Sequence, residues 1–123
     1  MRSIVPLIAA IALGSCTTLP DPVRGDGHAR LGEATRVGAL RVTPRAIVED
    51  SRCPINARCV WAGRVVLSTL VVGGGWTETR DLTLGESTAL RGTTLALTSV
   101  EPGKMAGAAP APGALLFGFD GGR

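Results

Sequence analysis

The sequence predicts an all-β fold, a small antiparallel sandwich or partly closed barrel of about six strands. Three observations predict it. Apolar and polar residues alternate with a period of two in several separate runs. Glycines and prolines gather between these runs, where the chain must reverse. No window of ten or more residues outside the N-terminal leader shows the spacing of an amphipathic helix.

The N-terminus has the layout of a secretory signal peptide, which we place at residues 1–15. Arg2 is followed by an apolar run from 4 to 13 and by small residues. The tetrad Leu13, Gly14, Ser15 and Cys16 resembles the lipobox of bacterial lipoproteins. That resemblance implies a diacylglyceryl group on the Cys16 thiol. The alternative is an ordinary cleavable signal followed by an incidental cysteine.

An acylated Cys16 predicts the location of the protein, because two or three acyl chains hold a protein on a membrane. The residue after Cys16 is Thr17. An Asp at this position would resemble the signal that retains lipoproteins at the inner membrane of enteric bacteria. We therefore expect the bacterial cell envelope, at the outer membrane and facing the periplasm. Residues 16–30 are rich in Pro, Gly and Asp, so we expect a lipid-anchored flexible tether that contains the only histidine, His28.

Residues 31–123 are expected to form the β-domain. Leu40, Val42, Ala46 and Val48 alternate with polar residues, which predicts a strand over 40–49 with these four on its buried face. Pro44 interrupts the run. Because proline cannot donate to a ladder, this strand should lie at a sheet edge or carry a bulge.

The next run, 60–72, is apolar on its odd positions and half apolar on its even ones, which predicts a strand in the centre of a sheet. Three glycines at 73–75 predict a tight hairpin, and 76–84 the partner strand with its threonines toward solvent. Further strands are expected over 93–100 and 115–119. The sequence LGES at 84–87 repeats LGEA at 31–34, either because the chain contains two related halves or by chance.

Between the first two of these strands lies the segment 49–63, EDSRCPINARCVWAG. Export places Cys53 and Cys59 in an oxidising compartment, so we expect them to form a disulfide that fixes the register of the sheet. The spacing differs from the pairs of zinc sites and of thiol–disulfide exchange enzymes. Trp61 shares a face with Val65 and is expected in the core, against the disulfide.

This segment also carries a resemblance to a known family. DSRCP at 50–54, followed after four residues by CVWAG at 59–63, resembles an uncharacterised family of small bacterial secreted proteins and lipoproteins. The similarity extends more loosely over residues 31–100. It implies an exported β-domain, and it assigns no activity, ligand or catalytic residue.

The candidate interaction surface consists of Asp50, Arg52 and Arg58. Asp50 should accept hydrogen bonds from the turn and pair with Arg52, while Arg58 lies within the predicted disulfide ring. The sequence indicates no catalytic residue, no metal site and no cofactor. Ser51 with His28 as a base is the only nucleophilic arrangement available, and nothing in the sequence orients it.

Charge and composition narrow the function further. The full chain carries +3, and removal of Arg2 with the leader leaves 12 − 10 = +2, spread singly along the chain, which argues against a nucleic-acid partner. We expect a non-enzymatic, lipid-anchored envelope protein that binds an envelope protein or cell-wall partner or has a structural role. The alternatives are a loop-presenting protease inhibitor or ligand-binding module, and an envelope enzyme.

Overall fold

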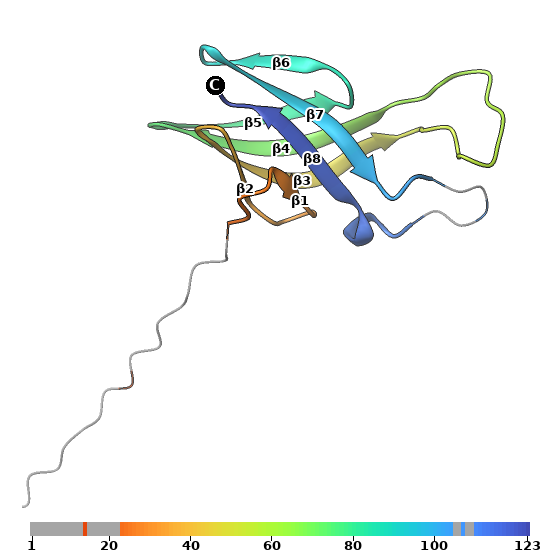
Figure 1. The fold of residues 1–123 in the computed structure, drawn as a ribbon, viewed down its shortest axis with the longest axis horizontal. Helices are drawn as coiled ribbons and strands as arrows, with labels where there is room; N and C mark the ends of the chain where they lie inside the picture. The colour runs from red at the N-terminus through yellow and green to blue at the C-terminus, as the bar shows by residue number, and fades with distance from the viewer. Residues whose placement is uncertain (1–13, 15–22, 105–106, 108–109) are drawn as a thin grey trace, which may run out of the picture.

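A computed structural model describes residues 14, 23–104, 107 and 110–123 of the chain (Figure 1). Most of the expected signal peptide, and Cys16, lie outside the described residues. Two four-stranded antiparallel sheets make up the fold. One sheet has the order β2 (Thr35–Val37), β3 (Leu40–Asp50), β4 (Val65–Gly73) and β5 (Trp76–Thr83). The other has the order β1 (His28–Ala29), β8 (Leu116–Gly121), β7 (Thr93–Glu101) and β6 (Ser87–Leu90).

The two sheets pack against each other as a small β-sandwich, which confirms the predicted fold class. Both contribute to one hydrophobic core, because alternate side chains of each strand point inward. A 3-10 turn, Pro112–Ala114, precedes β8. In the described part of the chain, helices of the length and apolarity needed to span a bilayer are absent. The buried cluster consists of Val37, Leu40, Val42, Val65, Leu67, Val71, Leu82, Leu90, Leu95, Leu97, Val100, Leu115, Phe117 and Phe119.

β4 is the central strand that the sequence predicts. It lies between β3 and β5, and its odd positions from Val65 to Val71 are buried. The hairpin to β5 turns at the predicted glycines, where Gly73 pairs with Trp76 and Gly75 has a φ of 79°. The strand begins at Val65 and not at Val60, a difference that decides the position of Trp61 below.

Pro44 produces the predicted bulge in β3. Pro44 pairs with Thr69 and the next pair is Ala46 with Ser68, so Arg45 has no partner in the ladder, and a second shift follows between Ile47 and Glu49. The extra residue reverses the side-chain alternation beyond it. Ala46 is therefore exposed, and Val48 is 58% exposed, although both were expected on the buried face. Ile47 packs against the core in their place.

The two LGE segments adopt the same local structure. In each, a glycine of positive φ (83° at Gly32, 85° at Gly85) closes a turn and donates its N–H to the strand after next. The acceptors are the carbonyls of Pro44 and Leu97, at 2.8 and 2.9 Å. Both acceptors stand at a bulge, and both pairs are separated by 53 positions (85 − 32 and 97 − 44). The sandwich is thus built from two similar hairpin units.

The folded domain begins before residue 31, which corrects the expected extent of the tether. Arg24 forms a parallel bridge with Thr35, and its N–H donates to the Ala34 carbonyl at 2.9 Å. His28 and Ala29 form β1, in which His28 pairs with Gly118 of β8. His28 therefore belongs to a sheet and not to a tether.

Candidate functional site

The segment between β3 and β4, residues 51–64, projects from one end of the sandwich and is called here the disulfide loop (yellow-green in Figure 1). Cys53 and Cys59 are joined in a disulfide, with their α-carbons 5.8 Å apart, as the sequence predicts. The bridge closes a ring within the loop. The ring lies outside the buried cluster, and its expected role in fixing the register of the sheet stays a prediction.

The neck of the loop is closed by Ser51 and Arg64. The Ser51 N–H donates to the Arg64 carbonyl at 2.9 Å, and the Arg64 N–H donates to the Ser51 hydroxyl oxygen at 2.9 Å. Gly63 has a φ of 67°, and a β-carbon there would overlap the Ser51 carbonyl oxygen. Only glycine fits this position, which accounts for the last residue of the CVWAG sequence.

An ion pair at the base of the loop confirms the predicted association of Asp50 with Arg52. Arg52 Nε donates to Asp50 Oδ1 at 2.9 Å and Nη2 to Oδ2 at 3.0 Å, a two-point contact. Only 14% of the Arg52 side chain and 22% of the Asp50 side chain are exposed. These hydrogen bonds from Arg52 hold the pKa of Asp50 below its usual value.

The same ion pair fastens the disulfide loop to the β7–β8 connection, which runs from residue 102 to 115. Arg52 Nη1 donates to the carbonyls of Val100 and Pro102, at 3.2 and 3.4 Å. Lys104 Nζ donates to the Asp50 carbonyl at 3.1 Å, and the Lys104 carbonyl accepts the Ile55 N–H at 2.8 Å. The ring is therefore held from two sides, by its own disulfide and by a neighbouring connection.

Large apolar side chains are exposed on this loop. Ile55 is 73% exposed, Val60 92% and Trp61 83%, and the three lie within six positions of one another. The prediction that Trp61 packs in the core is wrong. Trp61 is exposed because the neck at Ser51 turns the chain at Gly63 and keeps residues 60–63 out of β4. Trp76 packs partly buried against the core instead.

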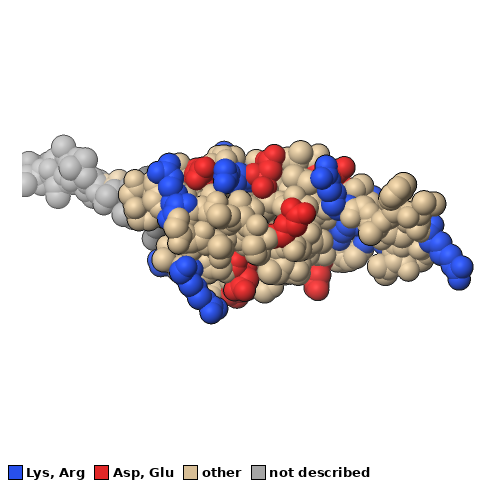
Figure 2. Space-filling model, turned by 90° about the horizontal axis from the view of Figure 1, so that it is seen from above, with Lys and Arg blue, Asp and Glu red and all other residues tan. Residues whose placement is uncertain are grey.

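Arg58 is exposed within the ring and, among the described residues, makes no ion pair. The other two charged residues of the loop are neutralised, Arg52 by Asp50 and Arg64 by Glu49. Figure 2 shows the loop end of the molecule as a lobe whose visible face carries uncharged and basic side chains. A site formed here presents apolar surface together with the exposed positive charge of Arg58.

The residues considered for nucleophilic chemistry are not brought together. Ser51 lies at the loop neck with its hydroxyl bonded to the Arg64 backbone. His28 lies in the other sheet, where its Nδ1 is 2.9 Å from the Asp26 carbonyl oxygen. No group of three His, Cys, Asp or Glu side chains among the described residues is placed to hold a metal ion.

Sequence reasoning missed Val60 and Lys104 as parts of the site. Lys104 lies 54 positions from Asp50, and no local pattern links the two. Comparisons with protein-family models, with curated proteins and with solved structures find no match for this chain.

Proposed function

We propose that this chain is a lipid-anchored protein of the bacterial cell envelope that binds a protein partner, without catalysis, through the disulfide loop. The observation that carries the proposal is the exposure of Ile55, Val60 and Trp61 on a loop held by a disulfide and by Arg52. Exposed apolar side chains grouped in this way are typical of interaction surfaces.

The chemistry of the loop indicates the chemistry of its partner. Tryptophan and arginine are the residues that contribute most to binding at protein interfaces, because they fill pockets and exclude water. Trp61 and Arg58 lie three positions apart, and both are exposed. The partner surface that complements them is an apolar pocket with carboxylates at its rim. A loop already fixed before binding loses less conformational entropy on association.

The placement of the loop agrees with an anchor at Cys16. The described domain begins at Val23, which lines the same hollow as Gly73 and Gly74 of the β4–β5 turn, whereas the disulfide loop precedes β4. In Figure 1 the orange start of the domain and the yellow-green loop lie toward opposite ends of the long axis. An anchored sandwich can therefore present the loop away from its own membrane attachment.

Photo-crosslinking in the bacterium that produces the protein tests the binding function. A photoreactive phenylalanine analogue is introduced at Val60 in one strain and at Val48, an exposed valine outside the loop, in another. We expect one protein to be attached at position 60 and not at 48, and the attachment to be lost on Trp61→Ala. Equal products at both positions, or products that persist in Trp61→Ala, contradict the proposal.

The anchor is tested separately. Cells that produce the chain are supplied with a radiolabelled fatty acid, and the label on the mature protein is compared between the wild type and Cys16→Ser. We expect label only on the wild type. A wild type that is exported and carries no label would remove the lipid anchor while leaving the binding loop in place.

The accessible position of Arg58 favours a second candidate function, inhibition of trypsin-like proteases. An arginine on a loop fixed by a disulfide can enter an acidic specificity pocket. Inhibition constants for a panel of such proteases should then rise on Arg58→Ala and remain unchanged on Trp61→Ala. The proposed protein interface requires both residues, so the two variants distinguish the candidates.

A further inference from the structure

The end of the sandwich farthest from the disulfide loop carries an unusual pair of arginines. Arg36 of β2 and Arg41 of β3 are directly opposite each other in the antiparallel ladder. Both side chains are exposed, because their neighbours Val37 and Leu40 face the core. Like charges at directly opposed positions destabilise a sheet. The pair therefore lowers the stability of the sheet, and it raises the positive potential at this end of the sandwich.

Within residues 23–104 and 110–123, no carboxylate forms an ion pair with Arg36 or Arg41. Asp26 lies near Arg36 but is engaged by Arg24 at 2.9 Å. Asp120 borders the same region and is 3.9 Å from Arg123. Two guanidinium groups thus remain available for an anion.

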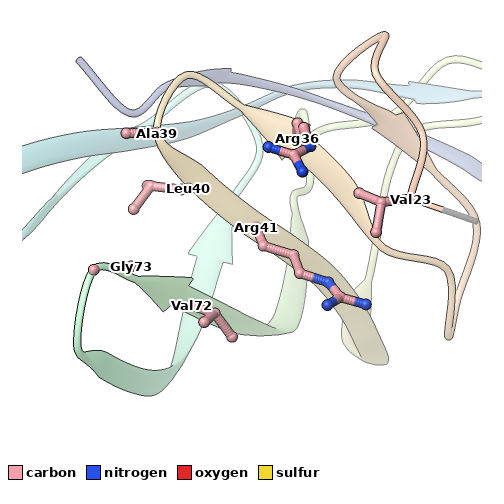
Figure 3. A pocket seen from close by; sticks show the side chains of 8 residues that line it. Val23, Arg36, Ala39, Leu40, Arg41, Val72 and Gly73 are labelled. Carbon is pink, nitrogen blue, oxygen red and sulfur yellow. The ribbon is translucent and has the colours of Figure 1, made fainter. Parts of the chain in front are cut away.

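A hollow of about 290 Å³ lies beside the pair and is lined by Val23, Leu40 and Val72 and by the β4–β5 turn at Gly73. Figure 3 shows the Arg36 and Arg41 side chains on one side of the β2–β3 hairpin, with Val23 beside them. The volume is at the small end of the range of ligand pockets, which suits a headgroup better than a larger ligand.

A phosphate group matches this chemistry. Guanidinium groups bind phosphate oxygens through paired, charge-assisted hydrogen bonds, and two arginines opposite each other in the ladder offer two such donor groups beside one hollow. The apolar wall formed by Val23 and Val72 suits the glycerol and first methylene groups that follow the phosphate of a phospholipid.

The position of the hollow indicates where such a phosphate comes from. Val23 borders the hollow and is seven positions after Cys16. Seven residues span at most about 25 Å. If Cys16 carries the acyl chains, as the proposed function holds, the hollow is always within reach of the membrane surface. Basic side chains at that surface are attracted to anionic lipids.

We propose that Arg36 and Arg41, with the hollow beside them, bind the phosphate group of an anionic phospholipid in the membrane that anchors the chain. The affinity for phosphate follows from the arginine pair alone, and the lipid as its source rests on the proposed anchor. Occupation of the site would hold the sandwich at the membrane with the disulfide loop directed outward.

Titration calorimetry on the acylated full chain in neutral detergent micelles tests this inference. The probes are short-chain phosphatidylglycerol, short-chain phosphatidylcholine and inorganic phosphate. The test variant is Arg36→Gln/Arg41→Gln. The matched control is Arg30→Gln/Arg45→Gln, which removes the same charge from two other exposed arginines that form no ion pair with any residue the structure describes.

We expect phosphatidylglycerol to bind more tightly than phosphatidylcholine, and its affinity to fall about tenfold or more in the test variant and less than about twofold in the control. Equal losses in the two variants, or no binding of phosphatidylglycerol by the wild type, overturn the site. Binding of inorganic phosphate as tight as that of phosphatidylglycerol, and dependent on the pair, overturns the lipid as its source.

Stability measurements separate a binding defect from a folding defect. Without an anion, removal of the like-charge pair should leave the urea midpoint unchanged or raise it. A lowered midpoint would show that the two arginines stabilise the hairpin and would overturn the inference. If the mature chain carries no acyl label at Cys16, the proposed anchor is overturned. The binding of inorganic phosphate by Arg36 and Arg41 is then judged from the calorimetry alone.

Discussion

Replacement of Arg52 by Met removes a charge that contacts three segments of the chain while keeping a long side chain. Arg52 makes two hydrogen bonds to the Asp50 carboxylate and two to the carbonyls of Val100 and Pro102. The substitution therefore leaves the Asp50 charge partly buried without its guanidinium partner, and it removes two of the contacts that hold the disulfide loop beside the β7–β8 connection.

The magnitude follows from the geometry. Hydrogen bonds between charged groups contribute about 1.5–3 kcal/mol, whereas exposed ion pairs contribute at most about 1 kcal/mol. The pair is exposed by only 14% and 22%, but it is not fully buried, and the two carbonyl contacts at 3.2 and 3.4 Å are long. We therefore expect Arg52→Met to lower the free energy of unfolding by about 2 kcal/mol.

The matched control is Arg64→Met. Arg64 pairs with Glu49 in the same loop, but the side chains of that pair are 64% and 39% exposed, so the expected loss is below about 0.5 kcal/mol. Urea unfolding at neutral pH measures both variants through the midpoint and the slope. A loss of less than about 0.5 kcal/mol for Arg52→Met, or equal losses for the two variants, would refute the reasoning.

Three further predictions concern the same loop. Because Arg52 holds the pKa of Asp50 below its unfolded value, the stability that Asp50 contributes is present above about pH 4 and is lost as the pH falls through the folded pKa, so the difference in urea midpoint between the wild type and Asp50→Asn should shrink below pH 4. Gly63→Ala should lower the free energy of unfolding by about 2 kcal/mol, whereas Gly74→Ala, where the added β-carbon meets open space, should change it by less than about 0.5 kcal/mol. A seven-residue ring contributes at most about 2.4 kcal/mol in the chain-entropy treatment. Cys53→Ala/Cys59→Ala should lose less than about 1 kcal/mol, since the opened loop gains freedom in the folded state too, and a loss near the full value would show that the contacts of the loop with Lys104 keep it ordered without the disulfide.

Features set by local sequence could be predicted, and those that depend on distant contacts could not. The disulfide and the Asp50–Arg52 pair join residues six and two positions apart. The bulge at Pro44 follows from its missing N–H. Lys104 approaches Asp50 only because β7 and β3 end at the same side of the sandwich, which no periodicity in the sequence records.

The error at Trp61 has a specific physical cause. Alternation carried back from Val65 places Trp61 on the buried face, and the argument holds only while the backbone stays extended. The positive φ of Gly63 ends that extension, and the hydrogen bonds between Ser51 and Arg64 close the loop before the strand begins. In this chain, the sequence from Cys59 to Gly63 therefore marks the neck of a loop and not the start of a strand.

β4 separates the two proposed sites. It has nine residues, so its ends are about 27 Å apart, with the disulfide loop before Val65 and the arginine hollow beside Gly73. Substitutions this far apart and without shared partners act additively on free energies. Trp61→Ala should therefore leave phosphatidylglycerol affinity unchanged, and Arg36→Gln/Arg41→Gln should leave crosslinking from position 60 intact when acyl chains hold the protein on the membrane. Coupling between the two would mean that the sandwich transmits strain along β4, and that the loop and the hollow form one functional unit.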